Sequence, residues 1–487
     1  MDAARNGAAS ECVALSSWIA GKWSTSGGTF EVYSPTTGSV IDRLRSAGSA
    51  DVDEAAAAAR QAFERYRATP APVRAGWCLS ASAAVLAHED RLARELSAEH
   101  GKPVADALAE VRSAANGFRM AAGVVLGDPG ESPSVADAGK RIAVRREPLG
   151  VWAVITPWNF PLNIPVEYIG PALSTGNAVV WKPAPTTARI AALFREVLLD
   201  ADFPQDLLQL VVTDELTVAQ HLTAHPMVSA IGFTGGSAAG EAIERAHPGK
   251  HLLLELGGNT AVVVLDDADL DAAADAIAAS AFWNAGQVCS AAGKVLVARP
   301  LHDALAQRVA DRARKTVLGD PLEPGTTQGP LHLAASVERI QAHVDDACSR
   351  GARLLTGGAV DARLGGGFYL PTVLADVPED AAAFHEETFG PVAALSAYDT
   401  EEELIAAANA GSYGLVAAVH TRSASRAFRV SEALEAGLVV VNDSSNYWEL
   451  NLPFGGAHGR RSGRGRLGGR FALSEFTQVK AIAIDIR

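Results

Sequence analysis

Residues 151–181, VWAVITPWNFPLNIPVEYIGPALSTGNAVVW, contain the alternation that decides the fold. An apolar run at Val151–Ile155 is followed by a helical segment at Pro165–Leu173 and by a second apolar run at Ala178–Trp181. Short apolar strands that alternate with helices are typical of a parallel sheet covered on both faces. Such a sheet binds ligands beyond the carboxyl ends of its strands.

The alternation continues downstream, and the first part of the chain is helical. The expected later elements are helices at Thr186–Leu199, Leu216–Leu222 and Ala238–Arg245, and strands at Leu208–Val212, Val228–Phe233 and Leu252–Glu255. A second α/β segment runs from Ala261–Leu265 to about Asn442, with strands at Lys294–Val297 and Leu438–Val441 and a helix at Asp303–Val317. The early helices are expected behind Asp51 as N-cap, at Ala75–His100 and at Val104–Gly117, before a loop at Gly127–Gly139. A final strand is expected within Phe476–Ile486.

Bulk composition excludes several classes of protein. A chain of 487 residues is too long for one core, so we expect two or three domains. The formal charge of −14 argues against general nucleic-acid binding. No apolar run approaches the ~20 residues that cross a bilayer, and the first 18 residues contain no apolar signal segment. The four cysteines lie far apart without a C-x-x-C pair, so we expect no disulfide framework, no metal site and a cytoplasmic location.

One local stretch is basic. Its members are Arg460, Arg461, Arg464, Arg466 and Arg470. Glycines interrupt the stretch and no aromatic residues alternate with it, so we interpret it as a solvated or interface loop.

A glycine turn joins an expected strand to an expected helix at residues 231–240, IGFTGGSAAG. Such a turn directs backbone N–H groups and the positive end of the helix toward a phosphate. Ser237 replaces the middle glycine of the G-x-G-x-x-G dinucleotide fingerprint. A phosphate site and a simple strand–helix turn both remain open.

Three segments contain side chains suited to chemistry at a carbonyl group. Cys289, within FWNAGQVCS at 282–290, is a candidate nucleophile, although a thiol with a pKa of about 8.5 needs activation. Glu255 ends an apolar strand before two glycines, and an apolar setting raises a carboxyl pKa, which suits a general base. Asn159, within PWNFP at 157–161, is a rigid amide donor for an oxyanion. Taken singly, each also fits a structural role: a packed cysteine, an ion-paired glutamate and a turn asparagine.

Together these segments resemble the aldehyde dehydrogenase superfamily over nearly the whole chain. Glu255 of ELGGN and Cys289 of GQVC stand 34 residues apart, in the order and spacing of that family. Further similar pieces are GNAVVWKP at 176–183, EETFGP at 386–391 and PFGG at 453–456.

The resemblance implies NAD(P)-dependent oxidation of an aldehyde to the carboxylic acid through a thioester on Cys289. Asn159 and the Cys289 backbone N–H would form the oxyanion hole, and Glu255 would activate the deacylating water. No metal is required. The residues implied for the cofactor are Trp158, Lys182 at the adenine ribose, Thr234, Gly235 and Gly240 at the pyrophosphate turn, Glu387 at the nicotinamide ribose and Phe389 on the nicotinamide.

The resemblance also implies an α/β architecture in three parts. A Rossmann-like parallel-sheet cofactor domain would comprise residues 1–125 and 149–256, and an α/β catalytic domain residues 257–455. A small β oligomerisation arm would comprise 126–148 and 470–487. Members of the family associate as homodimers or homotetramers through such an arm, in which Arg141–Arg146 and Ala481–Ile486 could serve here.

The chain departs from the family at the cofactor. Many members carry glutamate three residues after the lysine that matches Lys182, where it binds ribose hydroxyls. This chain has Pro185 there, so NAD and NADP are both admissible.

A second departure concerns the substrate. Members that act on anionic semialdehydes often have an arginine in the segment similar to residues 442–449, where this chain has Trp448 and Glu449. The other expected tunnel residues are Phe160, Ile164, Trp283 and Phe454. The hypothesis is an uncharged, apolar or aromatic aldehyde, supported by similarity of residues 182–187 and 462–465 to benzaldehyde- and vanillin-type members. The aromatics could instead fill a domain interface, and Glu167 near the tunnel could favour a polar or cationic substrate.

Three alternatives are set against this hypothesis. The first is an acylating dehydrogenase that passes the thioester to coenzyme A, which Glu255 argues against because a water-activating base is counterproductive there. The second is a semialdehyde dehydrogenase with an anionic substrate. The third is a binding protein that kept the fold but lost catalysis, which the presence of all three catalytic residues disfavours.

Overall fold

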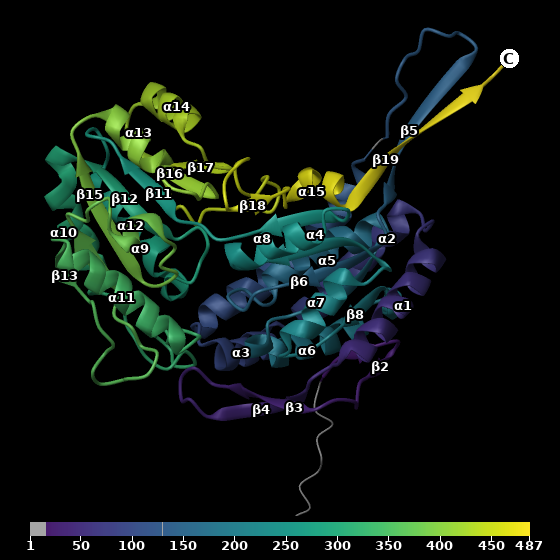
Figure 1. Cartoon of the computed structure of the whole chain (residues 1–487), viewed down its shortest axis with the longest axis horizontal. Coiled ribbons are helices and arrows are strands. Elements are labelled where there is room, and N and C mark those ends of the chain that lie inside the picture. Colours follow the sequence, from purple (N-terminus) through teal and green to yellow (C-terminus); the bar gives the residue numbers. More distant parts are fainter. Residues whose placement is uncertain (1–15, 129) are drawn as a thin grey trace, which may run out of the picture.

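The computed structural model describes residues 16–128 and 130–487. Two open sheets lie side by side, each flanked by helices, and a two-stranded ribbon projects from the body that holds the first sheet (Figure 1). This arrangement confirms the α/β fold expected from the alternation of strands and helices.

The first sheet has eight strands in the order β18-β10-β9-β6-β7-β8-β1-β2. The five strands from β10 to β8 are parallel, while β18, β1 and β2 add antiparallel edges. The bounds in chain order are β1 Trp18–Ile19, β2 Lys22–Trp23, β6 Val151–Ile155, β7 Ala178–Lys182, β8 Leu208–Leu210, β9 Val228–Thr234, β10 His251–Glu255 and β18 Gly463–Arg464. The first four residues of β6 are buried, because this central strand has helices on both faces.

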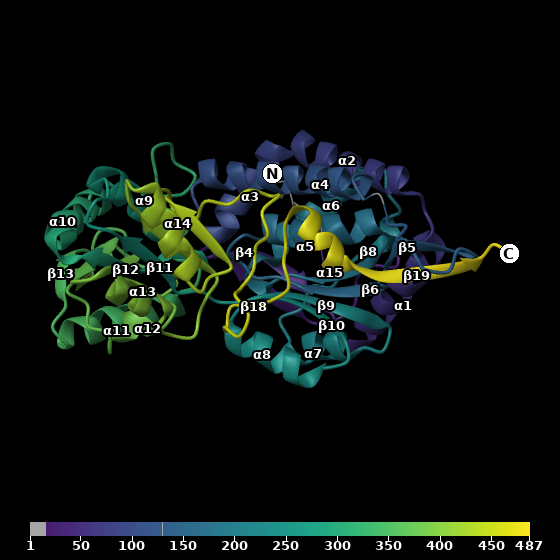
Figure 2. The same cartoon turned by 90° about the horizontal axis from the view of Figure 1, so that it is seen from above.

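Helices cover both faces of this sheet (Figure 2). Helices α2 to α6 and α15 lie on one face, and α7 and α8 lie on the other. The bounds are α1 Ser49–Tyr66, α2 Ala71–Ala87, α3 Glu89–His100, α4 Val104–Leu126, α5 Asn163–Thr175, α6 Ala188–Val197, α7 Leu216–Ala224, α8 Ser237–Ala246 and α15 Gly469–Phe476. Short 3-10 turns occur at Pro185–Thr187, Leu198–Asp200 and Gln205–Leu207.

The second sheet has seven strands in the order β13-β14-β15-β12-β11-β16-β17. All its pairs are parallel except that of β13 with β14. The strands are β11 Thr260–Val264, β12 Ala292–Ala298, β13 Arg353–Thr356, β14 Thr372–Ala375, β15 Val392–Tyr398, β16 Val416–His420 and β17 Leu438–Val441. The helices are α9 Leu270–Phe282, α10 His302–Ala313, α11 Ala335–Ser349, α12 Ala382–His385, α13 Glu401–Asn409 and α14 Ala424–Ala433, with 3-10 turns at Trp283–Gly286 and Arg299–Leu301.

Two smaller sheets complete the fold. The projecting ribbon pairs β5 (Lys140–Pro148) with β19 (Thr477–Asp485) in an antiparallel register of nine residue pairs. A second hairpin pairs β3 (Thr29–Tyr33) with β4 (Val40–Arg45) at the opposite side of the molecule (Figure 1).

The early helices differ in detail from the sequence prediction. Asp51 is not the N-cap of α1: Gly48 takes that position, and its N–H donates to Asp51 Oδ2 at 2.8 Å from three residues upstream. The helix expected over 75–100 is interrupted at His88.

Helix α4 continues nine residues beyond Gly117, because Phe118, Ala121 and Val125 remain on its buried face. A Cβ at Gly117 would lie 2.9 Å from Val166 Cγ1 of α5, so this glycine permits close helix packing and does not end a helix.

The basic stretch at 460–470 makes ion pairs with acidic side chains. Arg461 pairs with Glu241 at 2.6 Å and Arg464 with Glu244 at 2.8 Å, both on α8. These ion pairs tie the C-terminal linker to α8.

In the part of the chain that the structure describes, no helix combines the length and apolar character needed to cross a bilayer. The same residues include no cluster of three or more histidine, cysteine, aspartate or glutamate side chains that could hold a metal ion. Cys78, Cys289 and Cys348 are free thiols, and Cys12 lies outside the described residues.

Candidate active site

Four strands of the first sheet end at one edge with site residues. Lys182 ends β7, Thr234 ends β9 and Glu255 ends β10, and their registers align through Ile155, the last residue of β6. The carboxyl ends of parallel strands thus gather three predicted site residues, as expected for such a sheet.

Cys289 follows a tight turn between α9 and β12. The turn contains three successive left-handed residues, Asn284 (φ 51°), Ala285 (φ 54°) and Gly286 (φ 69°). A Cβ at Gly286 would lie 2.0 Å from the carbonyl oxygen of Gly390, so only glycine fits there. Non-glycine residues held in this region are strained, which the surrounding packing must offset.

A second glycine lets Cys289 approach the end of β10. A Cβ at Gly258 would lie 2.2 Å from the carbonyl oxygen of Cys289. Gly258 lies three residues after Glu255, so the absence of its side chain lets the two segments meet. Cys289 and Glu255 consequently line the same cavity.

The Cys289 thiol is held in its neutral form. Burial is the main cause that raises its pKa, and the nearby carboxyl groups of Glu387, Glu255 and Glu167 add to it. Attack on a carbonyl carbon therefore requires that a base take the thiol proton.

Glu255 is buried without any hydrogen-bond partner for its carboxyl group. The residue is 3% exposed, and both carboxyl oxygens lack a partner among the described residues. Burial raises its pKa well above the usual value, and Glu167 raises it further. A carboxyl group kept basic in this way is suited to take a proton from water.

Asn159 lies next to the cysteine turn. Its Nδ2 donates to the carbonyl oxygen of Gln287 at 3.0 Å, two residues before Cys289. Its own carbonyl oxygen accepts from Lys102 Nζ at 2.9 Å and from Asn284 Nδ2 at 3.3 Å. Asn159 is 4% exposed and does not itself line the cavity.

The sequence interpretation did not identify two residues that hold Asn159 in place. Lys102 Nζ and Glu110 Oε2 form an ion pair of 2.5 Å, and both side chains are almost completely buried. Glu110 Oε1 also accepts from the backbone N–H of Leu162 at 2.9 Å, so the pair fixes the loop after Asn159 from two sides. No local pattern marks this pair, because both residues belong to an ordinary helical region of the sequence.

The cavity at Cys289 has a volume of about 310 Å³. All five predicted substrate residues line it: Phe160, Ile164, Trp283, Trp448 and Phe454. The rings of Phe160 and Trp283 lie 5.2 Å apart, and those of Trp448 and Phe454 lie 5.8 Å apart. Among the described residues that line the cavity, the ionisable side chains other than Cys289 are the carboxyl groups of Glu110, Glu167 and Glu255.

The predicted cofactor residues surround the opposite side of Cys289. Glu387 Oε1 accepts from the Gly258 N–H at 2.9 Å, and burial raises the pKa of Glu387 to about 7. Phe389 has a left-handed backbone (φ 48°), and its ring lies edge-on to Trp158 at 5.6 Å. Trp158 in turn stacks on His332 at 4.8 Å.

Lys182 and the turn before α8 provide cationic and N–H groups. The Lys182 ammonium makes no ion pair or hydrogen bond within the described residues although the residue is 9% exposed, and burial lowers its pKa to about 8. Thr234 Oγ1 lies 2.7 Å from the Tyr168 hydroxyl, and the Gly235 N–H donates to the Glu255 carbonyl at 3.0 Å. A Cβ at Gly240 would lie 2.3 Å from Leu256 Cδ2, so this glycine lets α8 pack against the segment after β10.

Comparison with known proteins shows one family. The profile of the aldehyde dehydrogenase family matches residues 23–482. The chain is 37% identical over 474 residues to a 3-sulfolactaldehyde dehydrogenase of Pseudomonas putida, covering 96% of each chain. It is 36% identical over 472 residues to an NADP-dependent succinate-semialdehyde dehydrogenase of Escherichia coli K12, covering 96% of this chain and 97% of the other.

Solved structures are equally similar. A crystal structure of an NADP-dependent enzyme of E. coli superposes with a TM-score of 0.94 at 36% identity, covering 97% of this chain and 98% of the other. A betaine aldehyde dehydrogenase of Staphylococcus aureus in complex with NAD⁺ gives a TM-score of 0.93 at 31% identity, covering 97% and 95%.

Proposed function

The chain belongs to the aldehyde dehydrogenase family, and on this premise we propose that it oxidises an uncharged, apolar or aromatic aldehyde through a thioester on Cys289. It is an NAD(P)-dependent oxidoreductase, as its relatives are. The observation that carries the substrate class is the cavity at Cys289, which aromatic and aliphatic side chains line together with carboxyl groups, and no cation among the described residues. A pocket of this kind favours apolar substrate surface and opposes a second negative charge.

The proposed first step forms a bond between Cys289 Sγ and the carbonyl carbon of the aldehyde. The thiol proton leaves to a base, for which Glu255 in the same cavity is the candidate, and the carbonyl oxygen becomes an alkoxide. The Cys289 N–H and Asn159 Nδ2 are the proposed donors to that alkoxide. An amide nitrogen has two N–H groups, and the described residues engage one of them, at Gln287.

Oxidation and hydrolysis complete the proposed sequence. The nicotinamide ring, when bound, supplies the acceptor for the hydride that the former carbonyl carbon loses. Glu255 then takes a proton from water, whose oxygen adds to the acyl carbon. Cleavage of the carbon–sulfur bond releases the carboxylic acid and restores Cys289.

The residues around Lys182 and α8 fit a dinucleotide. We propose that the unpaired Lys182 ammonium binds the adenine ribose, and that Gly235 and Gly240 shape the turn at the N-terminus of α8 for the pyrophosphate. Trp158 and Thr234 border this site, Glu387 would hold the nicotinamide ribose, and Phe389 would pack on the nicotinamide. Pro185 places no carboxylate against a 2′-phosphate, which leaves room for both NAD and NADP.

We also propose the division of labour among the parts of the chain. Residues 1–125 and 149–256 would bind the dinucleotide, and residues 257–455 would supply the nucleophile. Residues 126–148 and 470–487 would join copies of the chain into a homodimer or homotetramer, because the ribbon of β5 and β19 projects away from both sheets (Figure 1).

An anionic semialdehyde is the second candidate substrate. Its support comes from the names of relatives, which include glutarate- and succinate-semialdehyde dehydrogenases at 35–37% identity. The acidic cavity of this chain opposes it. Transfer of the acyl group to coenzyme A is disfavoured by Glu255, whose basic carboxyl group would divert the thioester to water.

A steady-state screen tests the proposal. Benzaldehyde, hexanal and succinic semialdehyde are each measured with NAD and with NADP, and kcat/KM is compared. We expect benzaldehyde or hexanal to exceed the semialdehyde by at least about tenfold, a ratio that corresponds to 1.4 kcal/mol. A preference for succinic semialdehyde would reject the proposed substrate class in favour of the second candidate.

A further inference from the structure

We propose that Glu167 is a specificity-determining residue that binds a neutral hydrogen-bond donor, such as a hydroxyl group, on the substrate and excludes aldehydes that carry a carboxylate. This inference rests on the proposed function, because it assigns a role to a second carboxyl group in the cavity at Cys289. Glu167 belongs to α5 and lines that cavity together with Cys289 and Glu255.

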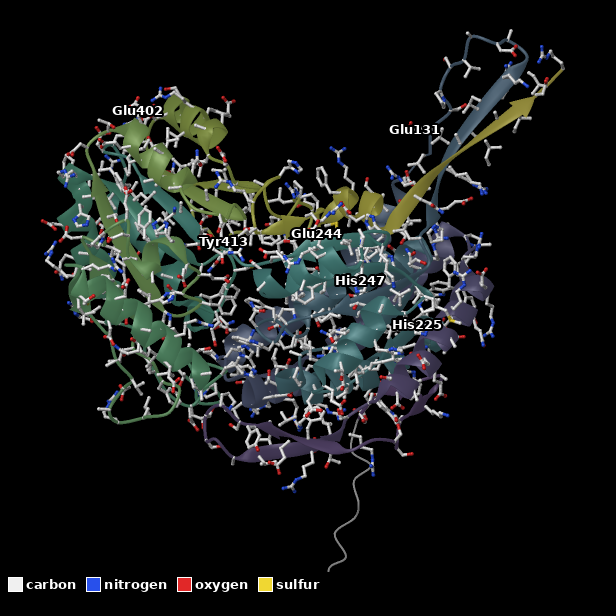
Figure 3. All side chains as sticks on the ribbon, viewed as in Figure 1. Glu131, His225, Glu244, His247, Glu402 and Tyr413 are labelled. Atoms are coloured by element: carbon white, nitrogen blue, oxygen red, sulfur yellow. The ribbon has the colours of Figure 1, made fainter. Side chains whose placement is uncertain are left out.

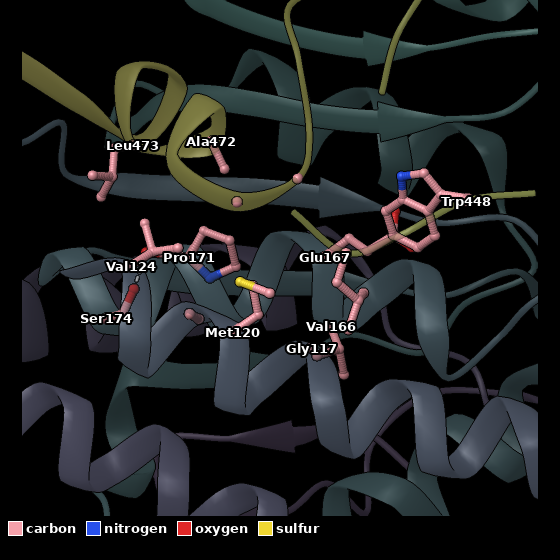
Figure 4. A pocket seen from close by; sticks show the side chains of 14 residues that line it. Gly117, Met120, Val124, Val166, Glu167, Pro171, Ser174, Trp448, Ala472 and Leu473 are labelled. Carbon is pink, nitrogen blue, oxygen red and sulfur yellow. Dashed lines mark hydrogen bonds between the residues drawn. The ribbon is translucent and has the colours of Figure 1, made fainter. Parts of the chain in front are cut away.

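The inner side of Glu167 offers it no polar partner. Behind Glu167 lies a small pocket of about 30 Å³ between α4, α5 and α15, with room for about two water molecules. Figure 4 shows Glu167 and Trp448 at one end of this pocket, and apolar side chains such as Met120, Val124 and Leu473 beyond them. The polar demand of Glu167 can therefore be met only from the cavity side.

Within the protein, Glu167 has a single hydrogen-bond partner. Its Oε1 accepts from Asn163 Nδ2 at 2.6 Å, and no lysine, arginine or histidine of the described residues lies within ion-pair distance. Glu110, the other acidic residue near it, is already neutralised by Lys102 at 2.5 Å. A carboxyl group can accept more hydrogen bonds than this, and leaving it unsatisfied is costly.

The protonation of Glu167 is compatible with a neutral partner. Burial raises its pKa to about 8, while the Asn163 hydrogen bond lowers it and Glu110 raises it. The group can thus donate or accept near neutral pH. A hydroxyl group can do the same, so the two form a hydrogen bond in either protonation state.

The same carboxyl group explains how an anionic aldehyde would be excluded. A second carboxylate on the substrate would enter a cavity lined by Glu110, Glu167 and Glu255 and by no cation among the described residues. A buried charge without a partner is strongly disfavoured. Glu167 has no counter-ion of its own, so it contributes most directly to this repulsion.

The test compares substrates of one shape with different substituents. kcat/KM is measured for benzaldehyde, for 2-, 3- and 4-hydroxybenzaldehyde and for 4-carboxybenzaldehyde, using the full-length protein, Glu167→Leu and Glu167→Gln. The matched control is Glu402→Leu, which removes an exposed carboxylate on α13, far from the cavity (Figure 3).

In the unaltered protein we expect at least one hydroxybenzaldehyde to exceed benzaldehyde by about tenfold or more, and 4-carboxybenzaldehyde to lie at least tenfold below it. In Glu167→Leu the hydroxybenzaldehyde ratio should fall to near one and the carboxybenzaldehyde ratio should rise about tenfold. Glu167→Gln, which keeps the shape and hydrogen bonding but loses the charge, should retain part of the hydroxyl preference. Glu402→Leu should keep both original ratios.

Two failures are distinguishable. If the unaltered protein prefers 4-carboxybenzaldehyde or succinic semialdehyde, the proposed function itself is wrong. If it prefers uncharged aldehydes but Glu167→Leu and Glu167→Gln leave both ratios unchanged, only the role of Glu167 is wrong. Should Glu167→Leu fail to fold, Glu167→Gln alone decides through the carboxybenzaldehyde ratio.

Discussion

The reacting end of the cavity and its far end are built in different ways. At the reacting end, the backbone fixes Cys289 through a left-handed turn, Glu255 through the end of a central strand and Asn159 through a buried ion pair. At the far end, Trp448 and Phe454 come from the linker after β17, and Glu167 comes from the face of α5. The comparison teaches that main-chain geometry sets the chemistry here and exchangeable side chains set the selection. Changes at the reacting end should alter the rate for every aldehyde, whereas changes at the far end should alter the order of preference.

The largest expected effect follows from Cys289→Ala. Removing the thiol abolishes the covalent route, so kcat should fall by at least about 10⁴-fold for benzaldehyde and hexanal alike. NAD(P)H formation at 340 nm measures it. Cys348→Ala on α11 serves as control and should retain full activity. Residual turnover near the original rate would exclude the thioester.

Glu255→Gln should reduce steady-state turnover by about 10²–10⁴-fold, because the amide cannot take a proton from water. Acylation should still occur if another base takes the thiol proton. Rapid mixing should then show a burst of NAD(P)H no larger than one per active site, and intact-mass measurement should detect the acyl group on Cys289. A loss of the burst together with turnover would assign Glu255 to the first step instead.

Asn159→Ala should reduce kcat by about 10²–10³-fold, equivalent to ~2.7–4 kcal/mol, because one oxyanion donor is lost. Asn159→Asp keeps the size but replaces the donor with an acceptor, and it should be at least as impaired. The reduction should be equal for benzaldehyde and hexanal. A reduction confined to one aldehyde would show that Asn159 binds substrate and not the alkoxide.

Trp448→Ala should change preference more than rate. Loss of a large apolar wall should lower kcat/KM for benzaldehyde by about tenfold relative to acetaldehyde, which is too small to reach the far end. Competition between the two aldehydes in one assay gives the ratio directly. An equal decrease for both would erase the distinction between the two ends.

The smallest expected effect is a shared pH dependence. The pKa values of Cys289 and Glu255 are both raised, and both groups act in their deprotonated forms. Activity should therefore increase severalfold from pH 6 to pH 9 and decrease as the pH falls. The profile should be the same for benzaldehyde and hexanal, because both groups belong to the reacting end. Profiles that differ between the two aldehydes would place a titrating group at the far end.

The predictability of the molecule follows the same division. Strands β6, β7, β9 and β10 could be predicted to within two residues, because apolar runs bounded by glycine and proline are local signals. The ELGGN and GQVC pieces likewise pointed to Glu255 and Cys289. The ion pair of Lys102 and Glu110 could not be predicted, because its effect on Asn159 depends on packing between α4 and a loop about 50 residues later.

The far end shows why side-chain selection is harder to predict than chemistry. The sequence placed Glu167 near the tunnel but could not show that one side of it faces apolar packing and the other the cavity. Gly117 was taken as a helix end, although it marks the contact of α4 with Val166. In both cases the deciding partner is brought in by the tertiary fold.

The ribbon of β5 and β19 has a consequence for how the protein is made. Its cross-strand contacts join residues as far apart as Lys140 and Asp485, 345 positions along the chain. On a ribosome, β5 emerges long before β19 exists, so its nine residues present unsatisfied N–H and C=O groups until nearly the whole chain has been translated. Arg141, Arg145 and Arg146 on that waiting strand would keep nascent chains from pairing through it by mutual repulsion.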